Sequence, residues 1–175
     1  RAGSPTPVHY VELGPGRGTL ARDALRAMER ATKAGGVEPQ VHLVEGSPAL
    51  REKQHELVPD ARFHDDLSSL PEDAPLLLVA NEFLDAMPVR QLVRAPEGWR
   101  EVMVGIEGGT LTYEPGSRPM DAAVPTIMRT LPEQTIIETS PAAAAVVDEV
   151  ARRLAAQGGA ALFIDYGHVA PRHGS

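Results

Sequence analysis

Residues 8–20 have the sequence VHYVELGPGRGTL, and this stretch decides the predicted fold. Its first half, residues 8–13, is a short run of β-favouring residues that ends abruptly at a glycine. We interpret it as a strand that enters a tight turn, after which Thr19 can cap a helix. The backbone of this turn can approach a ligand closely because three of its residues carry no side chain, namely Gly14, Gly16 and Gly18.

The same strand-and-helix pattern recurs along the chain. After a strand at residues 40–45, Ser47 and Pro48 can begin a helix that extends to about Leu57, and another helix can begin after Ser140. Further strands are predicted at residues 61–64, 75–80 and 160–165. This alternation predicts a Rossmann-like α/β fold with a mostly parallel sheet, helices on both faces and a ligand at the carboxyl ends of the strands.

One stretch departs from this pattern. Residues 101–106 and 110–113 are β-like runs on either side of two glycines, which predicts a hairpin, and the proline-containing residues 114–132 are predicted to be mostly loop. The whole is predicted to be one domain over residues 1–175, with a core at 8–98 and 138–168 and an inserted hairpin and loop at 99–137. Because the chain starts at Arg1 and stops soon after a strand, we expect it to be a fragment of a longer protein.

The composition restricts the partners and the location. A net charge of -7 and a pI near 5.3 disfavour binding to nucleic acid or to anionic membranes. The absence of cysteine removes disulfides and cysteine-ligated zinc, and it agrees with a reducing compartment. The six histidines show no metal-binding spacing, so no metal is predicted. We predict a cytoplasmic protein, or a protein of the mitochondrial matrix if the source is eukaryotic.

The spacing of the glycines distinguishes between two ligand classes. Dinucleotide enzymes prefer G-x-G-x-x-G, but Thr19 occupies the position of the third glycine in that pattern. The chain instead has G-x-G-x-G, with Glu12 two positions before the first glycine. An acidic residue there suits a cationic, amino-bearing ligand better than a pyrophosphate, and S-adenosylmethionine is such a ligand.

Polar residues also follow the other predicted strands. Glu45 ends the second strand, where a carboxylate can accept hydrogen bonds from ribose hydroxyls. Asp65 and Asp66 follow the third strand, where one carboxylate could accept from an adenine amino group, although both residues could equally cap the loop.

The motif NEFLDAMP at residues 81–88 follows the fourth strand and is the predicted reaction centre. Asn81, Glu82 and Asp85 could orient a nucleophilic nitrogen, and a carboxylate can hold a guanidinium through two hydrogen bonds. Asn81 or Asp85 could instead simply cap a helix.

Several motifs together resemble the MidA-like methyltransferase family, which includes the mitochondrial complex I assembly methyltransferase. They are VELGPGRGTL, EGSPALREKQ, VANEFLDAMPVRQ, the triplet at residues 99–101, IETSPAA and FIDYGH. The resemblance implies a class I methyltransferase fold with added elements, S-adenosyl-L-methionine as methyl donor and, for the mitochondrial relative, arginine methylation of proteins. Carried over by position, it places the methionine end of the cofactor against Glu12, Gly14, Gly16 and Gly18, the ribose at Glu45 and adenine near Asp66, with Asn81 and Glu82 after the fourth strand. The cofactor site that we predict from all of these observations also includes Ser47, Asp65 and Asn81, and the predicted catalytic residues are Asn81, Glu82 and Asp85.

Three functions follow from these observations. The first is a methyltransferase that acts on a protein side chain, most plausibly arginine, held by Glu82 or Asp85. The second is a nicotinamide-dependent oxidoreductase, which Thr19 and Glu12 disfavour. The third is a non-catalytic binding or assembly module that keeps the cofactor fold.

Overall fold

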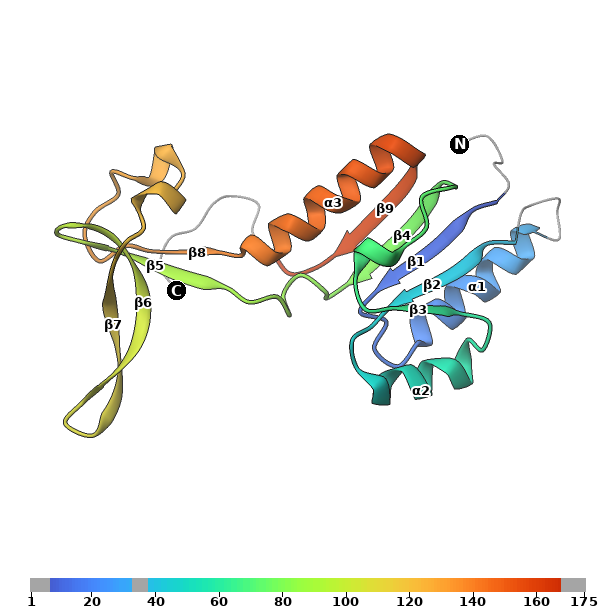
Figure 1. Cartoon of the computed structure of the whole chain (residues 1–175), viewed down its shortest axis with the longest axis horizontal. Helices are drawn as coiled ribbons and strands as arrows, with labels where there is room; N and C mark the ends of the chain where they lie inside the picture. The colour runs from blue at the N-terminus through green and yellow to red at the C-terminus, as the bar shows by residue number, and fades with distance from the viewer. Residues whose placement is uncertain (1–6, 33–37, 168–175) are drawn as a thin grey trace. The chain divides into compact units, whose positions relative to one another are not determined.

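The computed structural model describes residues 7–32 and 38–167 of the 175-residue chain. The chain divides into two compact units, which are Arg1–Ala86 with Ala143–Tyr166, and Met87–Ala142 with Gly167–Ser175. The first unit contains a parallel sheet and the second contains an antiparallel sheet (Figure 1). The second unit of the structure therefore begins at Met87 and its main segment ends at Ala142. The sequence pattern predicts a shorter insertion, at residues 99–137.

Five parallel strands form the sheet of the first unit in the order β3-β2-β1-β4-β9. β1 lies between β2 and β4, in a register that places Leu13 opposite Val44 and Ala80. Every strand matches its prediction to within one residue at each end, so the predicted α/β fold is confirmed. The bounds are His9–Leu13 for β1, Gln40–Val44 for β2, Arg62–His64 for β3, Leu76–Asn81 for β4 and Gly159–Ile164 for β9.

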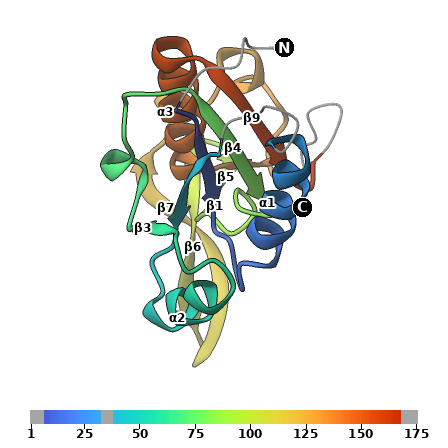
Figure 2. The ribbon, with the colours of Figure 1, turned by 90° about the vertical axis from the view of Figure 1, so that its right-hand side faces the viewer.

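Helices cover both faces of this sheet (Figures 1 and 2). Tyr10 and Leu43 pack with residues of α1 and α2 on one face, while Leu13 and Leu78 pack with residues of α3 on the other. Because side chains alternate along a strand, Glu12 lies on the same face as Tyr10. The helices begin where the sequence predicts, and their bounds are Thr19–Thr32 for α1, Pro48–Leu57 for α2 and Pro141–Gln157 for α3.

The second unit is built on a four-stranded antiparallel sheet in the order β7-β6-β5-β8. Its core surrounds Trp99, which is fully buried and donates a hydrogen bond from Nε1 to the carbonyl of Arg129 over 3.2 Å. The predicted hairpin is confirmed, and its turn contains Gly108 and Gly109. The bounds are Arg90–Ala95 for β5, Gly98–Glu107 for β6, Thr110–Pro119 for β7 and Ile136–Thr139 for β8.

The sequence prediction was incomplete in this unit. The loop predicted from residue 114 was wrong in its first part, because β7 continues to Pro119. Prolines and a glycine are tolerated there because β7 is an edge strand. One side of an edge strand has no neighbouring strand, so a proline that lacks an N–H on that side loses no hydrogen bond of the sheet. β5 was not predicted because arginines interrupt its apolar run, and β8 was not predicted because it is only four residues long.

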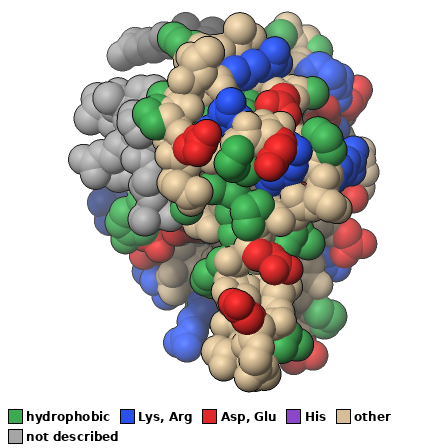
Figure 3. All heavy atoms as spheres, turned by 90° about the vertical axis from the view of Figure 1, so that its left-hand side faces the viewer, with side chains coloured by type: hydrophobic (Ala, Val, Ile, Leu, Met, Phe, Trp, Pro, Cys, Tyr) green, Lys and Arg blue, Asp and Glu red, His purple; other side chains and the backbone are tan. Residues whose placement is uncertain are grey.

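The hairpin of β6 and β7 exposes several apolar side chains, and Figure 3 shows hydrophobic side chains interspersed with charged ones on this face. The exposed apolar residues of the hairpin are Met103, Val104, Ile106, Leu111 and Tyr113. Two short 3-10 helices, Asp121–Ala123 and Thr126–Met128, follow β7. Among the described residues, no helix combines the length and the apolar character needed to cross a membrane.

Three histidines from neighbouring strands form a hydrogen-bonded chain on one face of the parallel sheet. His9 Nδ1 lies 3.1 Å from His42 Nε2, and His42 Nδ1 lies 2.9 Å from His64 Nε2. The chain ends at Asp73 Oδ1, 2.9 Å from His9 Nε2, and at Ser69 Oγ, 2.9 Å from His64 Nδ1. The carboxylate of Asp73 can only accept a hydrogen bond, so His9 donates to it from Nε2. If His42 and His64 are also neutral and donate from Nε2, every hydrogen bond between the rings has one donor and one acceptor.

Burial opposes a positive charge on two of these three histidines, His42 and His64. His42 is 1% exposed, and burial together with its histidine neighbours lowers its pKa to about 4. Burial also lowers the pKa of His64. The folded protein therefore favours the neutral form of both rings.

We expect the free energy of unfolding to fall as the pH is lowered from 6.5, the ordinary pKa of histidine, towards about 4, the pKa of His42. In this interval the unfolded chain binds protons that the folded chain does not, so stability rises with pH. Denaturant titrations at several pH values measure this dependence.

The variant His42→Gln keeps a side chain that can both donate and accept, and it should flatten the pH dependence by about one proton. His55→Gln is the matched control, because His55 is exposed on α2. Equal slopes for His42→Gln and the wild type would show that the histidine chain does not cause the effect.

Candidate cofactor site at the carboxyl edge of the parallel sheet

The turn after β1 depends on glycine. Gly14, Gly16 and Gly18 have φ values of 60°, 55° and 81°, in the left-handed region that side chains other than glycine rarely adopt. The turn is anchored by Gly14 N, which donates to the carbonyl of Val44 over 3.0 Å, and by Gly18 N, which donates to the carbonyl of Pro15 over 2.8 Å. The first of these bonds ties the turn to the end of β2.

The surroundings of the three glycines differ. A Cβ at Gly14 would lie 2.8 Å from the ring of Phe83, and one at Gly18 would lie 3.3 Å from Gln54 Cα. A Cβ at Gly16 would meet nothing within 4 Å. Packing therefore explains the outer two glycines, whereas Gly16 borders open space that a ligand can enter. The proximity of Phe83 to Gly14 confirms that the turns after β1 and β4 lie at the same edge.

Glu12, the acidic residue before the turn, is buried with 3% of its surface exposed. Its Oε2 accepts a hydrogen bond from the hydroxyl of Tyr10 over 3.0 Å. Burial raises the pKa of Glu12, and the hydrogen bond from Tyr10 partly offsets this effect. Glu12 pairs with no cationic side chain among residues 7–32 and 38–167. A cationic ligand at this edge would relieve the cost of ionising it.

Glu45 follows β2, and both of its carboxylate oxygens are held by hydrogen bonds. Oε1 accepts from the backbone amide of Ser47 over 2.8 Å, and Oε2 accepts from Nε2 of Gln54 over 3.3 Å. Arg51 Nε also donates to the backbone carbonyl of Glu45 over 2.6 Å. Ser47 thus binds the Glu45 carboxylate through its backbone amide, and its side chain makes no capping hydrogen bond to α2.

Gln54 is a site residue that the sequence analysis did not identify. It is fully buried on α2, and its Nε2 also donates to the carbonyl of Gly16 over 2.7 Å. One signal was available, because Gln54 stands between Leu50 and Leu57 at the spacing of a core-facing helix position. A polar residue in such a position implies a specific buried partner.

Asp65 and Asp66 both have local partners after β3. Asp65 accepts from Arg51 Nη2 over 2.6 Å, and Asp66 caps the 3-10 helix η1 (Leu67–Ser69) by accepting from Ser68 N over 2.8 Å. The hydrogen bonds from Ser68 lower the pKa of Asp66. Both carboxylates are exposed at the same edge as Glu45, and their contact with adenine stays a prediction.

The polar residues at the end of β4 and in the loop after it are exposed. Asn81 ends the strand, and Glu82 adopts a φ of 50°, which is uncommon for a residue other than glycine. Glu82 N donates to the carbonyl of Ile164 over 2.7 Å, which fixes this strained backbone against the end of β9. The side chains of Asn81, Glu82 and Asp85 are all exposed, as an acceptor-binding role requires.

Asp165 positions this loop and was also missed as a site residue. Its Oδ2 accepts from the backbone amides of Leu84 and Asp85 over 2.8 Å and 3.3 Å, and its Oδ1 accepts from Tyr166 N over 3.0 Å. Its position at the end of a predicted strand was the available signal, although that strand, β9, is largely exposed. His168, the last residue of the motif FIDYGH, lies outside the described residues.

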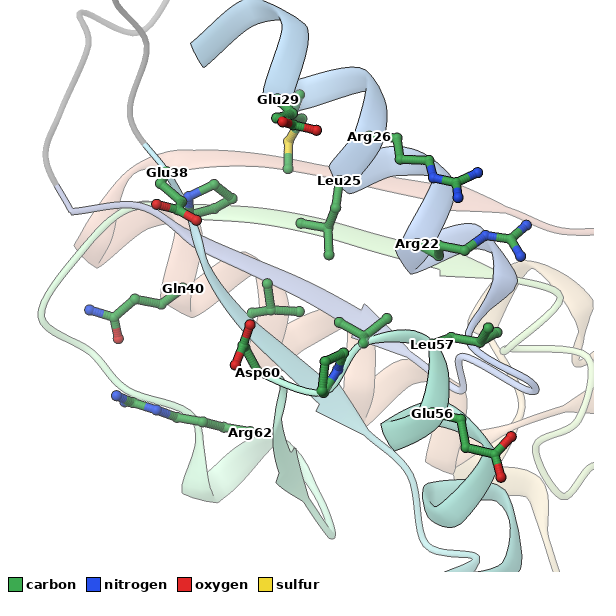
Figure 4. A pocket seen from close by; sticks show the side chains of 15 residues that line it. Arg22, Leu25, Arg26, Glu29, Glu38, Gln40, Glu56, Leu57, Asp60 and Arg62 are labelled. Carbon is green, nitrogen blue, oxygen red and sulfur yellow. The ribbon is translucent and has the colours of Figure 1, made fainter. Parts of the chain in front are cut away.

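A cavity of about 1010 Å³ lies elsewhere, between α1, the C-terminal part of α2 and the starts of β2 and β3 (Figure 4). Its lining includes Arg22, Glu38, Glu56 and Arg62, so its charge is mixed. Most of these segments are at the amino ends of the strands, although Arg22 lies in the first turn of α1, and none of the predicted site residues lines the cavity. Ligands of open α/β sheets bind at the carboxyl ends, so this cavity is not the cofactor site.

The described part of the chain contains no group of three or more His, Cys, Asp or Glu side chains that could hold a metal ion.

Residues 1–175 match the family model Methyltransf_28, described as "Putative S-adenosyl-L-methionine-dependent methyltransferase". The chain belongs to this family. The predicted family resemblance and the predicted cofactor, S-adenosyl-L-methionine, are thereby confirmed. The open space at Gly16 and the buried Glu12, which has no cationic partner within residues 7–32 and 38–167, fit a ligand that carries an ammonium group.

Solved structures in the COG1565 superfamily agree with this family assignment. One from Burkholderia thailandensis, bound to S-adenosyl-homocysteine, matches with a TM-score of 0.70 and 32% identity over 94% of this chain and 43% of that chain. A native crystal structure of a superfamily protein from the same organism matches with a TM-score of 0.71 and 30% identity over 94% of this chain and 45% of that chain.

Curated relatives of this chain are named protein arginine methyltransferase NDUFAF7, mitochondrial. The Danio rerio protein is 34% identical over 95% of this chain and 46% of its own length. The Homo sapiens protein is 34% identical over 95% of this chain and 43% of its own length. The chain thus spans less than half the length of these relatives.

We expect Gly16→Val to abolish cofactor binding, because the new side chain would fill the open space and strain a left-handed backbone. Gly108→Val is a matched control, since Gly108 has a φ of 58° and its Cβ would also meet nothing within 4 Å. Both variants should lose similar stability, but only Gly16→Val should lose affinity for S-adenosyl-homocysteine. Equilibrium dialysis and thermal unfolding measure the two quantities. A folded Gly16→Val protein with unchanged affinity would make the turn purely structural.

Proposed function

We propose that this chain provides the cofactor-binding part of a methyltransferase that acts on a protein side chain, with arginine as the preferred acceptor. The observation that carries the proposal is the open left-handed turn at Gly16, which follows the buried carboxylate of Glu12. The names of relatives at 30–34% identity support arginine as the acceptor. Their mitochondrial names support a matrix location if the source is eukaryotic, and we propose the cytoplasm otherwise.

Each residue of the carboxyl edge has a role in this proposal. Glu12 faces the cationic amino-acid end of the cofactor, and Gly14, Gly16 and Gly18 leave room for it to lie against the main chain. Glu45, oriented by Ser47, accepts from the ribose hydroxyls. The remaining cofactor-facing residues, Asp65, Asp66 and Asn81, contribute at the adenine side and next to the methyl group.

The acceptor is held by the exposed residues after β4. The cofactor supplies an electrophilic methyl group on a sulfonium, so the acceptor nitrogen needs orientation more than it needs a strong base. Glu82 holds the guanidinium through two hydrogen bonds, and Asn81 orients the attacking nitrogen. Asp85 lies close enough along the chain to share the positive charge and to receive the proton that the product releases. The net negative charge of the chain also favours a cationic protein substrate over nucleic acid.

We expect Glu82→Gln to keep cofactor affinity within several-fold while methyl transfer in the intact protein falls by about two orders of magnitude or more. This is the scale of losing one well-placed electrostatic partner, and Gln cannot neutralise a guanidinium. A radiolabelled transfer assay on an arginine-bearing protein, run beside a binding titration, separates the two effects.

Glu56→Gln is the control for this substitution, because Glu56 is also an exposed glutamate of the first unit but lies near the opposite edge of the sheet. It should change neither quantity. Equal transfer rates in the wild type and Glu82→Gln would remove Glu82 from the mechanism. Absence of transfer by the intact wild type to every protein tested would favour a binding or assembly module.

A further inference from the structure

One buried amide connects the two loops that the proposed function assigns to the cofactor. Gln54 Nε2 donates to the carbonyl oxygen of Gly16 over 2.7 Å and to Glu45 Oε2 over 3.3 Å. Gly16 belongs to the turn after β1, and Glu45 follows β2. The side chain that joins them comes from a third element, α2, and is 0% exposed.

The orientation of this amide is determined by its neighbours. A carbonyl oxygen and a carboxylate oxygen can only accept hydrogen bonds, so the nitrogen of Gln54 must face both. This orientation leaves Gln54 Oε1 buried without a hydrogen-bond partner among the described residues. A buried, unpaired oxygen costs stability, and an apolar residue of the same shape would avoid that cost. Core packing alone therefore does not explain a glutamine here.

The hydrogen bond also fixes the peptide plane in the middle of the glycine turn. Because a trans peptide places its C=O and N–H on opposite sides, a Gly16 carbonyl that points to Gln54 directs the amide of Arg17 away from it. Gly16 lacks a Cβ, so this peptide could otherwise rotate easily. The close approach of α2, seen in the 3.3 Å between a Cβ at Gly18 and Gln54 Cα, holds the glutamine backbone in place.

We infer that Gln54 is a positioning residue that fixes the glycine turn and the Glu45 carboxylate relative to each other, so that the amino-acid end and the ribose of one cofactor molecule are recognised together. This inference rests on the cofactor roles proposed above for Gly16 and Glu45. Its consequence is a coupling between the two halves of the site: a ligand that uses both halves depends on Gln54 more than a ligand that uses only one.

The variant Gln54→Met tests this role, because methionine keeps the length of the side chain but cannot donate. We expect affinity for S-adenosyl-homocysteine to fall at least tenfold and affinity for adenosine, which lacks the amino-acid end, to fall less. Thermal stability should change little, since the loss of the unpaired oxygen offsets the loss of the two hydrogen bonds that the amide donates. Calorimetric titration with both ligands and thermal unfolding provide these measurements.

Gln157→Met is the matched control. The amide of Gln157 on α3 is also buried without a partner among the described residues, and α3 packs on the opposite face of the sheet from α2. Its substitution removes a buried amide of the same kind and should leave both affinities unchanged.

Gln54→Glu provides a second test if Gln54→Met fails to fold. The ionised glutamate cannot donate and would repel Glu45, whereas the protonated acid could again donate to Gly16. Its affinity for S-adenosyl-homocysteine, divided by that of the wild type at the same pH, should therefore rise as the pH is lowered from 8 to about 5.

The results distinguish a failure of this inference from a failure of the proposed function. If the wild type binds no S-adenosyl-homocysteine, the proposed cofactor site is wrong. If the wild type binds it and Gln54→Met binds both ligands as tightly, Gln54 is a structural residue and the inference is wrong. A ratio for Gln54→Glu that does not change with pH would also contradict it.

Discussion

The pairing of β1 between β2 and β4 is the constraint on which the site depends. The register places Leu13 opposite both Val44 and Ala80, so the loops that follow these three strands leave the sheet at one level. All three residues are buried, and a slip of one residue would move each strand's apolar set to the opposite face. The same slip would transfer Glu12 to the face that packs on α3. Burial of the core thereby positions the polar residues at its edge.

Locally unfavourable features gather at this edge of the sheet. Glu12 is a buried carboxylate with a raised pKa, Gln54 has an unpaired buried oxygen, and Glu82 holds a left-handed backbone. Two of these features have a counterpart elsewhere, since Gln134 also has a left-handed backbone and Gln157 also has a buried, unpaired oxygen among the described residues. Their combination around one turn, next to open space at Gly16, is typical of a site in which binding of a ligand offsets the cost to the free protein.

The sequence predicted the parallel sheet well because most of its strands are short runs of apolar residues bounded by glycine, proline or a polar residue. It also placed Glu12 and Glu45 at the expected ligand edge, since a carboxylate at a strand end lies there wherever the sheet is parallel, and their contact with the cofactor stays a prediction. The same strand-end signal was present at Asp165 but was not used, whereas Gln54 lies on a helix and could not be assigned in this way. Their roles come from hydrogen bonds to Gly16 and Leu84, residues distant in sequence that only the fold brings close. In the second unit the hairpin was predicted, but β5, β8 and the end of β7 were missed for a different reason. Arginines in β5, prolines in β7 and the short length of β8 remove the apolar alternation that identifies a strand.

The central claim is that the carboxyl edge of the parallel sheet binds S-adenosyl-L-methionine and not a dinucleotide. Isothermal titration of one sample of this chain with S-adenosyl-L-methionine, S-adenosyl-homocysteine and NAD tests the claim most directly. The account predicts saturable binding of the first two at one site per chain and no detectable heat of binding with NAD, because Thr19 replaces the third glycine and Glu12 disfavours a pyrophosphate. Binding of NAD alone by the folded chain would contradict it.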